Sequence, residues 1–127
     1  MPLRPLHLRT LWLVIGWAMV AVVILLSLIP LKADLSEGKD KWSHFVAYGA
    51  LMFWFCLLFF RQTWWAVAFI AMGIVIEVLQ SYTGYRSFEY TDMVANAVGV
   101  LLGWILAQTP LRGLLQWLEC LLSRNLT

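Results

Sequence analysis

The sequence predicts an all-α membrane protein with four antiparallel transmembrane helices and a C-terminal amphipathic helix at the interface. Three observations predict this class. Hydrophobic residues make up 62% of the 127 residues and charged residues 13%, whereas about half and roughly a quarter are usual in soluble proteins. Uncharged stretches of about 20 residues, enough to cross a bilayer as a helix, recur along the chain. The alternation expected of a barrel is absent, and in lipid a helix satisfies its own backbone hydrogen bonds.

The same composition excludes several classes of function. Nine Lys and Arg against seven Asp and Glu give a net charge of +2 with no basic tract, so we expect no nucleic-acid partner. Cys56 and Cys120 show no CxxC or Cys/His spacing, and we interpret both as packing residues. We expect residues 1–127 to form a single transmembrane domain.

The first predicted span covers residues 11–31, between Arg9 and Lys32. Arg4 and Arg9 before an apolar run resemble the start of a secretory signal. The run is too long for a signal and no A-x-A cleavage site follows, so we expect this span to be retained. Pro30 stands at its end, where a helix can stop without breaking a hydrogen bond inside the bilayer.

The other three spans follow from the distances between charges. They are predicted at residues 42–60, 64–82 and 92–109. The third differs from the others because it carries Glu77 and Gln80 within its apolar pattern. The connections are short, which favours antiparallel neighbours. Four spans then place the start of the second, the end of the third and the start of the fourth at one membrane face.

A C-terminal amphipathic helix is predicted at residues 111–123, beyond Pro110. Its leucines recur at helical spacing opposite polar residues, which is typical of a helix lying on a membrane surface. Trp117 would anchor this helix at the interface.

The positive charges give the orientation only weakly. One side carries five (Arg4, Arg9, Arg61, Arg112, Arg124) and the other four (Lys32, Lys39, Lys41, Arg86). If Lys41 and Arg86 are retained for function, the ratio becomes five to two and favours both termini in the cytoplasm. This interpretation assumes a functional site.

Polar residues of three spans are expected to meet at the same face. The set is Asp40, Lys41, His44, Tyr48, Glu77, Gln80, Arg86, Asp92 and Asn96. At roughly 100° per residue, Asp40, His44 and Tyr48 share one stripe of the second span. The stripes of the third and fourth spans continue inward as glycines, and Gly99 and Gly103 are spaced for close helix approach. The sequence therefore predicts one polar pocket.

Glu77 is the most costly member of this pocket. It lies about 7 Å below Tyr82 by helical rise, and a charge at membrane depth costs on the order of 3 kcal/mol or more unless it is paired. Glu77 needs either a cation, with Arg86, Lys41 or protonated His44 as candidates, or a proton of its own. Burial would raise its pKa and a neighbouring cation would lower it, and both outcomes stay open.

Two interpretations stay open that involve no anionic ligand. One has no ligand at all, and the other has a metal ion. In the first, the polar residues join helices by hydrogen bonds worth about 0.6 kcal/mol each, with Asp40 and Asp92 as helix N-caps. In the second, Asp40, His44, Glu77 and Asp92 ligate a divalent metal ion, which the adjacent cations disfavour. We expect no metal and no other cofactor.

The other interpretations involve an anionic ligand. In catalysis, His44, Glu77, Asp40 and Asp92 would exchange protons during hydrolysis or group transfer. Lys41 and Arg86 would hold a phosphate or carboxylate, and the remaining substrate contacts would come from Gln80, Asn96 and Tyr48. In binding without catalysis, the same residues would hold an anionic envelope lipid or a partner's polar segment. Enzyme and binding module both stay open.

These polar residues also carry a family resemblance. The motif residues are Asp40-Lys41-x-x-His44-Phe45-x-x-Tyr48, then Ile76-Glu77-Val78-Leu79-Gln80, then Arg86, then Asp92-x-x-Ala95-Asn96-x-x-Gly99. This combination resembles the VanZ-like family of small bacterial membrane proteins. The resemblance implies a helical membrane protein with its pocket on the extracytoplasmic side. The family is named for a member associated with low-level teicoplanin resistance, which points toward the cell envelope without implying a molecular activity.

We therefore expect a multi-pass protein of the cytoplasmic (inner) membrane with both termini in the cytoplasm. Its expected task is recognition, and in the catalytic case modification, of an anionic lipid-linked envelope component. The expected partner is a membrane lipid or a lipid-linked envelope precursor. Small-residue helix faces would also allow a homo-oligomer.

Overall fold

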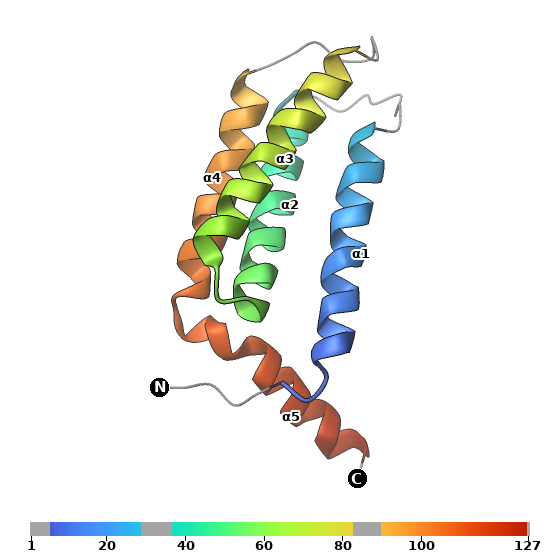
Figure 1. Cartoon of the computed structure of the whole chain (residues 1–127), viewed down its shortest axis with the longest axis vertical. Coiled ribbons are helices and arrows are strands. Elements are labelled where there is room, and N and C mark those ends of the chain that lie inside the picture. Colours follow the sequence, from blue (N-terminus) through green and yellow to red (C-terminus); the bar gives the residue numbers. More distant parts are fainter. Residues whose placement is uncertain (1–5, 29–36, 83–89, 127) are drawn as a thin grey trace.

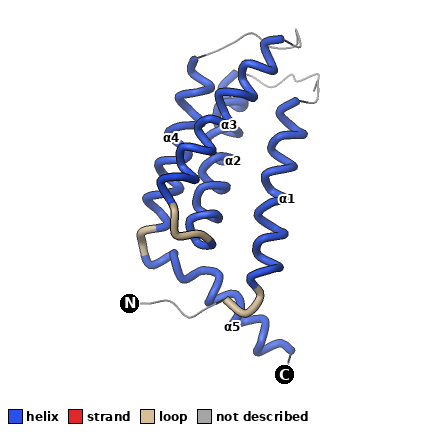
Figure 2. Tube along the Cα trace, viewed as in Figure 1, coloured by secondary structure: helices blue, strands red, loops and turns tan. Residues whose placement is uncertain are grey.

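The chain is all-helical in a computed structural model that describes residues 6–28, 37–82 and 90–126. The elements are α1 (Arg9–Leu28), α2 (Glu37–Leu58), α3 (Gln62–Tyr82), α4 (Tyr90–Ala107), the 3-10 helix η1 (Pro110–Gly113) and α5 (Leu114–Leu126). Figure 2 shows helices and loops and no strand in these described residues. The predicted all-α class is therefore confirmed.

The helices match the predicted segments with small shifts at their ends. α2 begins at Glu37, so Asp40 lies inside the helix, and Asp92 is the third residue of α4. Neither aspartate is at an N-cap, and this alternative from the sequence was wrong because both helices begin earlier than expected. Asp92 still lies in the first turn of α4, where the positive end of the helix dipole stabilises a carboxylate.

The four long helices lie side by side, and the chain direction alternates from one to the next (Figure 1). The contacts agree with this arrangement. Arg9 at the start of α1 donates to the carbonyl oxygen of Leu58 at the end of α2, at 2.7 Å. Gln62 at the start of α3 accepts from Gln108, just after α4, also at 2.7 Å. The start of α2, the end of α3 and the start of α4 therefore lie at one end of the bundle.

α2 and α4 pack with their backbones in direct contact. A Cβ atom added to Gly99 would meet the Phe45 carbonyl oxygen and lie 3.2 Å from the Gly49 nitrogen. One turn along, a Cβ on Gly103 would meet the Gly49 carbonyl oxygen. Only glycine allows two helices to approach this closely, as the small-xxx-small spacing predicts.

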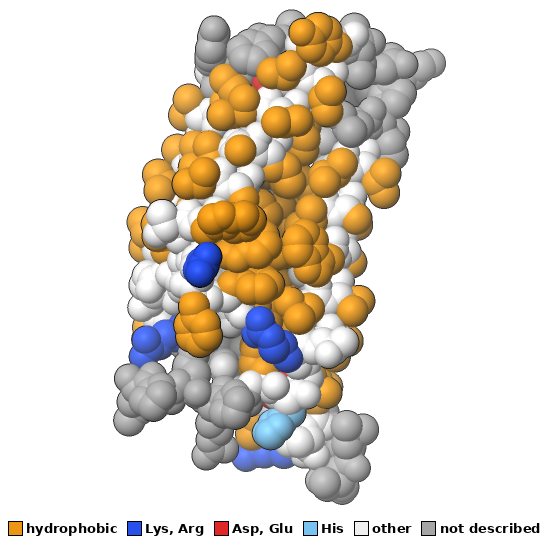
Figure 3. Space-filling model, viewed as in Figure 1, with side chains coloured by type: hydrophobic (Ala, Val, Ile, Leu, Met, Phe, Trp, Pro, Cys, Tyr) orange, Lys and Arg blue, Asp and Glu red, His pale blue; other side chains and the backbone are white. Residues whose placement is uncertain are grey.

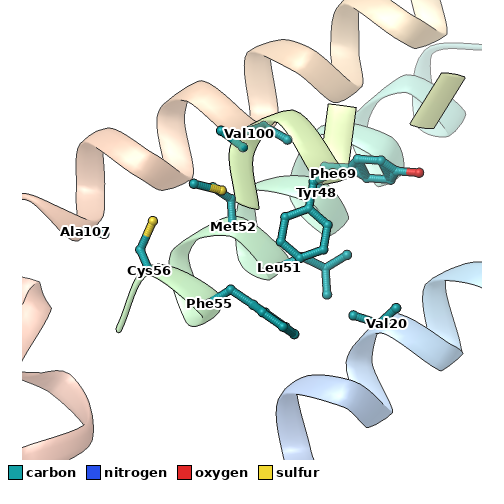
Figure 4. Packing of buried hydrophobic residues seen from close by; sticks show 10 residues of the cluster. Val20, Tyr48, Leu51, Met52, Phe55, Cys56, Phe69, Val100 and Ala107 are labelled. Atoms are coloured by element: carbon teal, nitrogen blue, oxygen red, sulfur yellow. The ribbon is translucent and has the colours of Figure 1, made fainter. Parts of the chain in front are cut away.

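An aromatic core joins α1, α2 and α3 (Figure 4). Phe55 of α2 is fully buried, and its ring centroid lies 4.8 Å from that of Trp65, 5.1 Å from Phe69 and 5.3 Å from Trp17. Such pairs contribute about 0.5–1.5 kcal/mol each beyond the area that they bury. Trp54 adds a hydrogen bond to α1, because its indole N–H donates to the carbonyl oxygen of Trp12 at 2.9 Å. These contacts attach α1 to the other helices.

The C-terminal helix is fixed to the start of α1. Leu115 of α5 is fully buried and packs with Trp12 and Leu58. The carboxylate of Glu119 accepts hydrogen bonds from the backbone N–H groups of His7 at 3.0 Å and Leu8 at 2.7 Å. It also accepts from the Trp12 indole at 2.8 Å. Glu119 thus satisfies N–H groups that the beginning of a helix leaves without an internal partner.

Two helices are long and apolar enough to cross a membrane, over Arg9–Ser27 and Gln62–Leu79. A third candidate exists if α4 together with η1 and α5 is one bent span. The apolar part of α2, Trp42–Leu58, is about 25 Å long, slightly less than a typical hydrocarbon core. On the face in Figure 3, hydrophobic side chains cover the middle of the molecule. The described helices therefore give two or three candidate spans, and four crossings stay a prediction.

Candidate functional site

Polar side chains from three helices are buried near one end of the bundle. Among the described residues, the buried polar and charged side chains are His44 (8% exposed), Glu77 (2%), Asp92 (2%) and Asn96 (3%). Tyr48 is also buried. His44 and Tyr48 belong to α2, Glu77 to α3, and Asp92 and Asn96 to α4. All five belong to the site predicted from the sequence.

The three helices meet at Gly73 of α3. A Cβ atom on Gly73 would lie 2.8 Å from Nδ2 of Asn96 on α4 and 3.1 Å from Cε2 of Tyr48 on α2. The missing side chain therefore lets an amide and a phenol ring reach the α3 backbone. Gly73 is one turn from Glu77, so it allows the close approach that brings the polar residues of α2 and α4 to the side of α3 that carries Glu77.

Tyr48 lies near the imidazole of α2 and within electrostatic range of the carboxylate of α3. Its ring centroid lies 6.5 Å from that of His44, one helical turn earlier, and its hydroxyl interacts electrostatically with Glu77. In Figure 4 the ring of Tyr48 joins the apolar core, while its hydroxyl oxygen points away from Cys56. Tyr48 therefore lies in the same buried region as His44 and Glu77.

Two buried oxygen atoms of the cluster carry unused hydrogen-bonding capacity. Within the described residues, the Tyr48 hydroxyl and Oδ1 of Asn96 are buried without a hydrogen-bond partner. Leaving such a group unsatisfied costs about 1–3 kcal/mol, and buried polar atoms usually bond to protein, water or ligand. A molecule entering the cluster would therefore find an acceptor at Asn96 and a donor or acceptor at Tyr48.

The remaining predicted site residues fall partly outside the described part of the chain. Asp40 and Lys41 lie on the first turns of α2, about one turn before His44, and Gln80 lies on α3, but their side chains are outside the described ones. Arg86 lies outside the described residues altogether. Whether Glu77 pairs with Arg86 or Lys41 therefore stays open. The roles of Lys41 and Arg86 in holding an anion stay predictions.

The described part of the chain offers no group of three His, Cys, Asp or Glu side chains arranged to hold a metal ion. Of the four predicted metal ligands, three are described: His44, Glu77 and Asp92. The imidazole of His44 and the carboxyl groups of Glu77 and Asp92 are groups able to exchange protons and to form hydrogen bonds.

An all-helical membrane protein with a buried polar cluster shared by three helices is the class that this fold and site define. The model of the VanZ/LLP1 family matches residues 17–112, which include all five buried site residues. The chain belongs to the VanZ/LLP1 family, and the resemblance seen in the sequence is confirmed. Neither the curated proteins nor the solved structures gave a match.

Proposed function

We propose that this VanZ-like protein uses its polar pocket to recognise an anionic lipid-linked component of the cell envelope, and that it can modify this component chemically. One observation carries the proposal: His44, Glu77 and Asp92, on three helices, are all buried although each is ionisable. Burying such groups at membrane depth is expensive, and they are retained where they serve a ligand or a proton pathway. Their position near the end of the bundle suits a headgroup at the lipid–water boundary.

The proposal includes four membrane crossings, by α1 to α4, in the cytoplasmic membrane. Both termini would be in the cytoplasm and the pocket would open on the extracytoplasmic side. The alternating direction of the helices (Figure 1) and their apolar surfaces (Figure 3) support this topology. The charge ratio of five to two in the sequence supports the orientation.

In this pocket the predicted roles divide between two groups of residues. Lys41 and Arg86 would hold the anionic group, and hydrogen bonds from Gln80, Asn96 and Tyr48 would orient it. The four groups able to exchange protons are His44, Glu77, Asp40 and Asp92. An imidazole beside carboxylates is a common pairing in general acid–base catalysis, because one group can accept a proton while another donates one.

A non-catalytic role is the second candidate, and one observation favours it. The side chains of Asn96 and Tyr48 pack tightly against the Gly73 backbone, as expected if polar residues serve to join helices or to bind a partner. In this case the cluster would hold the bundle together or bind a partner, and no substrate would be changed. One set of variants distinguishes this candidate from the first.

The test uses Glu77→Gln and His44→Ala in the full chain, with Val78→Ala, an exposed neighbour of Glu77, as the control. We would measure membrane accumulation, the lipids that co-purify by native mass spectrometry, and any mass change in an added anionic polyprenyl phosphate. Normal accumulation and lipid retention with loss of the mass change would establish catalysis. If the variants lose the co-purifying lipids and the unmodified protein causes no mass change, the pocket binds lipid without catalysis.

Two outcomes would contradict the proposal. If both variants fail to accumulate while Val78→Ala accumulates normally, the polar residues are structural. If both variants retain the same lipids and produce the same mass change as the unmodified protein, the pocket is neither the recognition site nor a catalytic site. A link to glycopeptide tolerance is a separate extension, and it predicts that deleting the gene lowers the teicoplanin concentration that inhibits growth.

A further inference from the structure

The end of the molecule opposite the polar pocket presents exposed positive charge. Arg61, in the turn between α2 and α3, and Arg112 of η1 are both exposed. The hydrogen bond between Gln62 and Gln108 joins the segments that carry them. In Figure 3 the visible Lys and Arg side chains lie in the lower half of this face, toward the end where α5 lies in Figure 1.

The described carboxylate at this end is engaged in hydrogen bonds. Three carboxylate side chains are described, and two of them, Glu77 and Asp92, belong to the polar pocket at the other end. The third, Glu119, is occupied by hydrogen bonds from the start of α1. Within the described residues, arginine side chains therefore outnumber acidic side chains at this end.

The orientation of α5 exposes an aromatic residue, Trp117, five positions after Arg112 in the chain. The segment of η1 and α5 is bent by 74° from α4, so it lies close to the membrane plane if α4 crosses the bilayer. Leu115 is buried against the bundle, and two residues later Trp117 points about 200° away from it. Trp117 is accordingly 58% exposed, although tryptophan is typical of the headgroup layer.

We propose that Arg61, Arg112 and Trp117 form a binding surface for the headgroups of anionic phospholipids. The guanidinium group of arginine presents donors in a fork that matches phosphate oxygens. A negatively charged leaflet attracts such residues next to transmembrane helices. The exposed indole supplies the apolar contact expected at the same depth. This surface is separate from the polar pocket and does not depend on its proposed ligand.

The first experiment compares two lipids with matched acyl chains on the detergent-purified full chain. Phosphatidylglycerol should raise the Tm more than phosphatidylcholine and should outnumber it on the protein in native mass spectra. In the double variant Arg61→Gln/Arg112→Gln this preference should fall by roughly fivefold for each arginine removed. The charge-preserving control Arg61→Lys/Arg112→Lys should keep most of it. Raising the ionic strength from about 0.05 M to about 0.5 M should weaken it in the unmodified protein.

The second experiment places Trp117 relative to lipid and water. A spin label would be attached after Trp117→Cys in a Cys120→Ser background, since the other cysteine, Cys56, is buried. In phosphatidylglycerol vesicles the label should collide more often with oxygen, which enriches in lipid, than with a water-soluble nickel complex. Equal lipid preference in the unmodified protein and the double Gln variant would overturn the proposal. A label reached only by the nickel complex would overturn it too and would favour a protein partner.

Discussion

Glu119 lies on α5, yet its three hydrogen-bond donors are His7 and Leu8, just before α1, and Trp12 in the first turn of α1. Partial desolvation raises the pKa of this carboxyl group. The hydrogen bonds from the Leu8 N–H, the Trp12 indole and the His7 N–H lower it by more, so the pKa lies below its ordinary value of 4.5. The charged form of Glu119 therefore stabilises the contact between the first and last helices.

Replacing this residue by Glu119→Gln should lower the stability of the detergent-purified protein by about 1 kcal/mol, the typical effect of losing a helix cap. The pH dependence should change as well. Because the folded pKa is lowered, the stabilisation is complete well above pH 4.5 and is lost as the pH falls through the folded pKa. Thermal unfolding at a series of pH values would measure both effects.

The control for this prediction is Ser123→Ala, an exposed polar position on the same helix. It should unfold at nearly the same temperature as the unmodified protein and show the same loss of stability in acid. A Glu119→Gln variant with an unchanged acid dependence would show that Glu119 does not carry this stabilisation.

At the scale of elements, the contact between α2 and α4 depends on glycine. Gly99 faces the Phe45 carbonyl oxygen and the Gly49 nitrogen, and backbone atoms cannot move aside as a flexible side chain can. Both helices also carry polar site residues on the turns nearest this contact, at His44, Tyr48 and Asn96. The spacing of α2 and α4 therefore controls how close these side chains lie.

The substitution Gly99→Ala should destabilise the protein by about 1–3 kcal/mol through overpacking, even though alanine favours a helix over glycine. It should also lower retention of the ligand proposed for the pocket. Thermal unfolding and native mass spectrometry of the purified protein would measure the two effects. Val98→Ala, at a partly exposed neighbouring position, is the control and should change both much less. Unchanged stability in Gly99→Ala would show that the helices are not in close contact.

At the scale of the whole molecule, the topology follows from which ends of the helices lie together. α5 packs on Trp12 and Leu58, at the end opposite the polar cluster. If α1 to α4 each cross the membrane, α5 and the end of α3 must lie on different sides of it. The native cysteines suit a test, because Cys120 is exposed and Cys56 is buried.

A membrane-impermeant maleimide applied to intact cells should leave Cys120 unlabelled until the membrane is permeabilised. After Tyr82→Cys in a Cys120→Ser background, the new thiol at the end of α3 should be labelled in intact cells. Tyr82 is exposed, so the substitution should not disturb the core. Labelling of both positions from the same side would contradict the four-span topology.

Several features could be predicted from the sequence because they follow from local chemistry. Apolar stretches of membrane-spanning length predicted the helices, since their backbone can satisfy its hydrogen bonds only internally in lipid. The polar residues in these stretches were conspicuous for the same reason. Five of them, His44, Tyr48, Glu77, Asp92 and Asn96, are buried in the structure, and helical periodicity placed each on an inward stripe.

Other features depended on contacts between residues far apart in the chain. Glu119 is one of the polar residues of the predicted amphipathic helix at residues 111–123. Only the folded chain brings it to the start of α1, where His7 is 112 positions away. The Gly73 contact with Asn96 and Tyr48 likewise exists only once three helices pack together. The sequence by itself determined which segments are helical and which residues are costly in lipid. Tertiary structure decided which of those residues meet, because distances between helices depend on packing and not on the periodicity of any one of them.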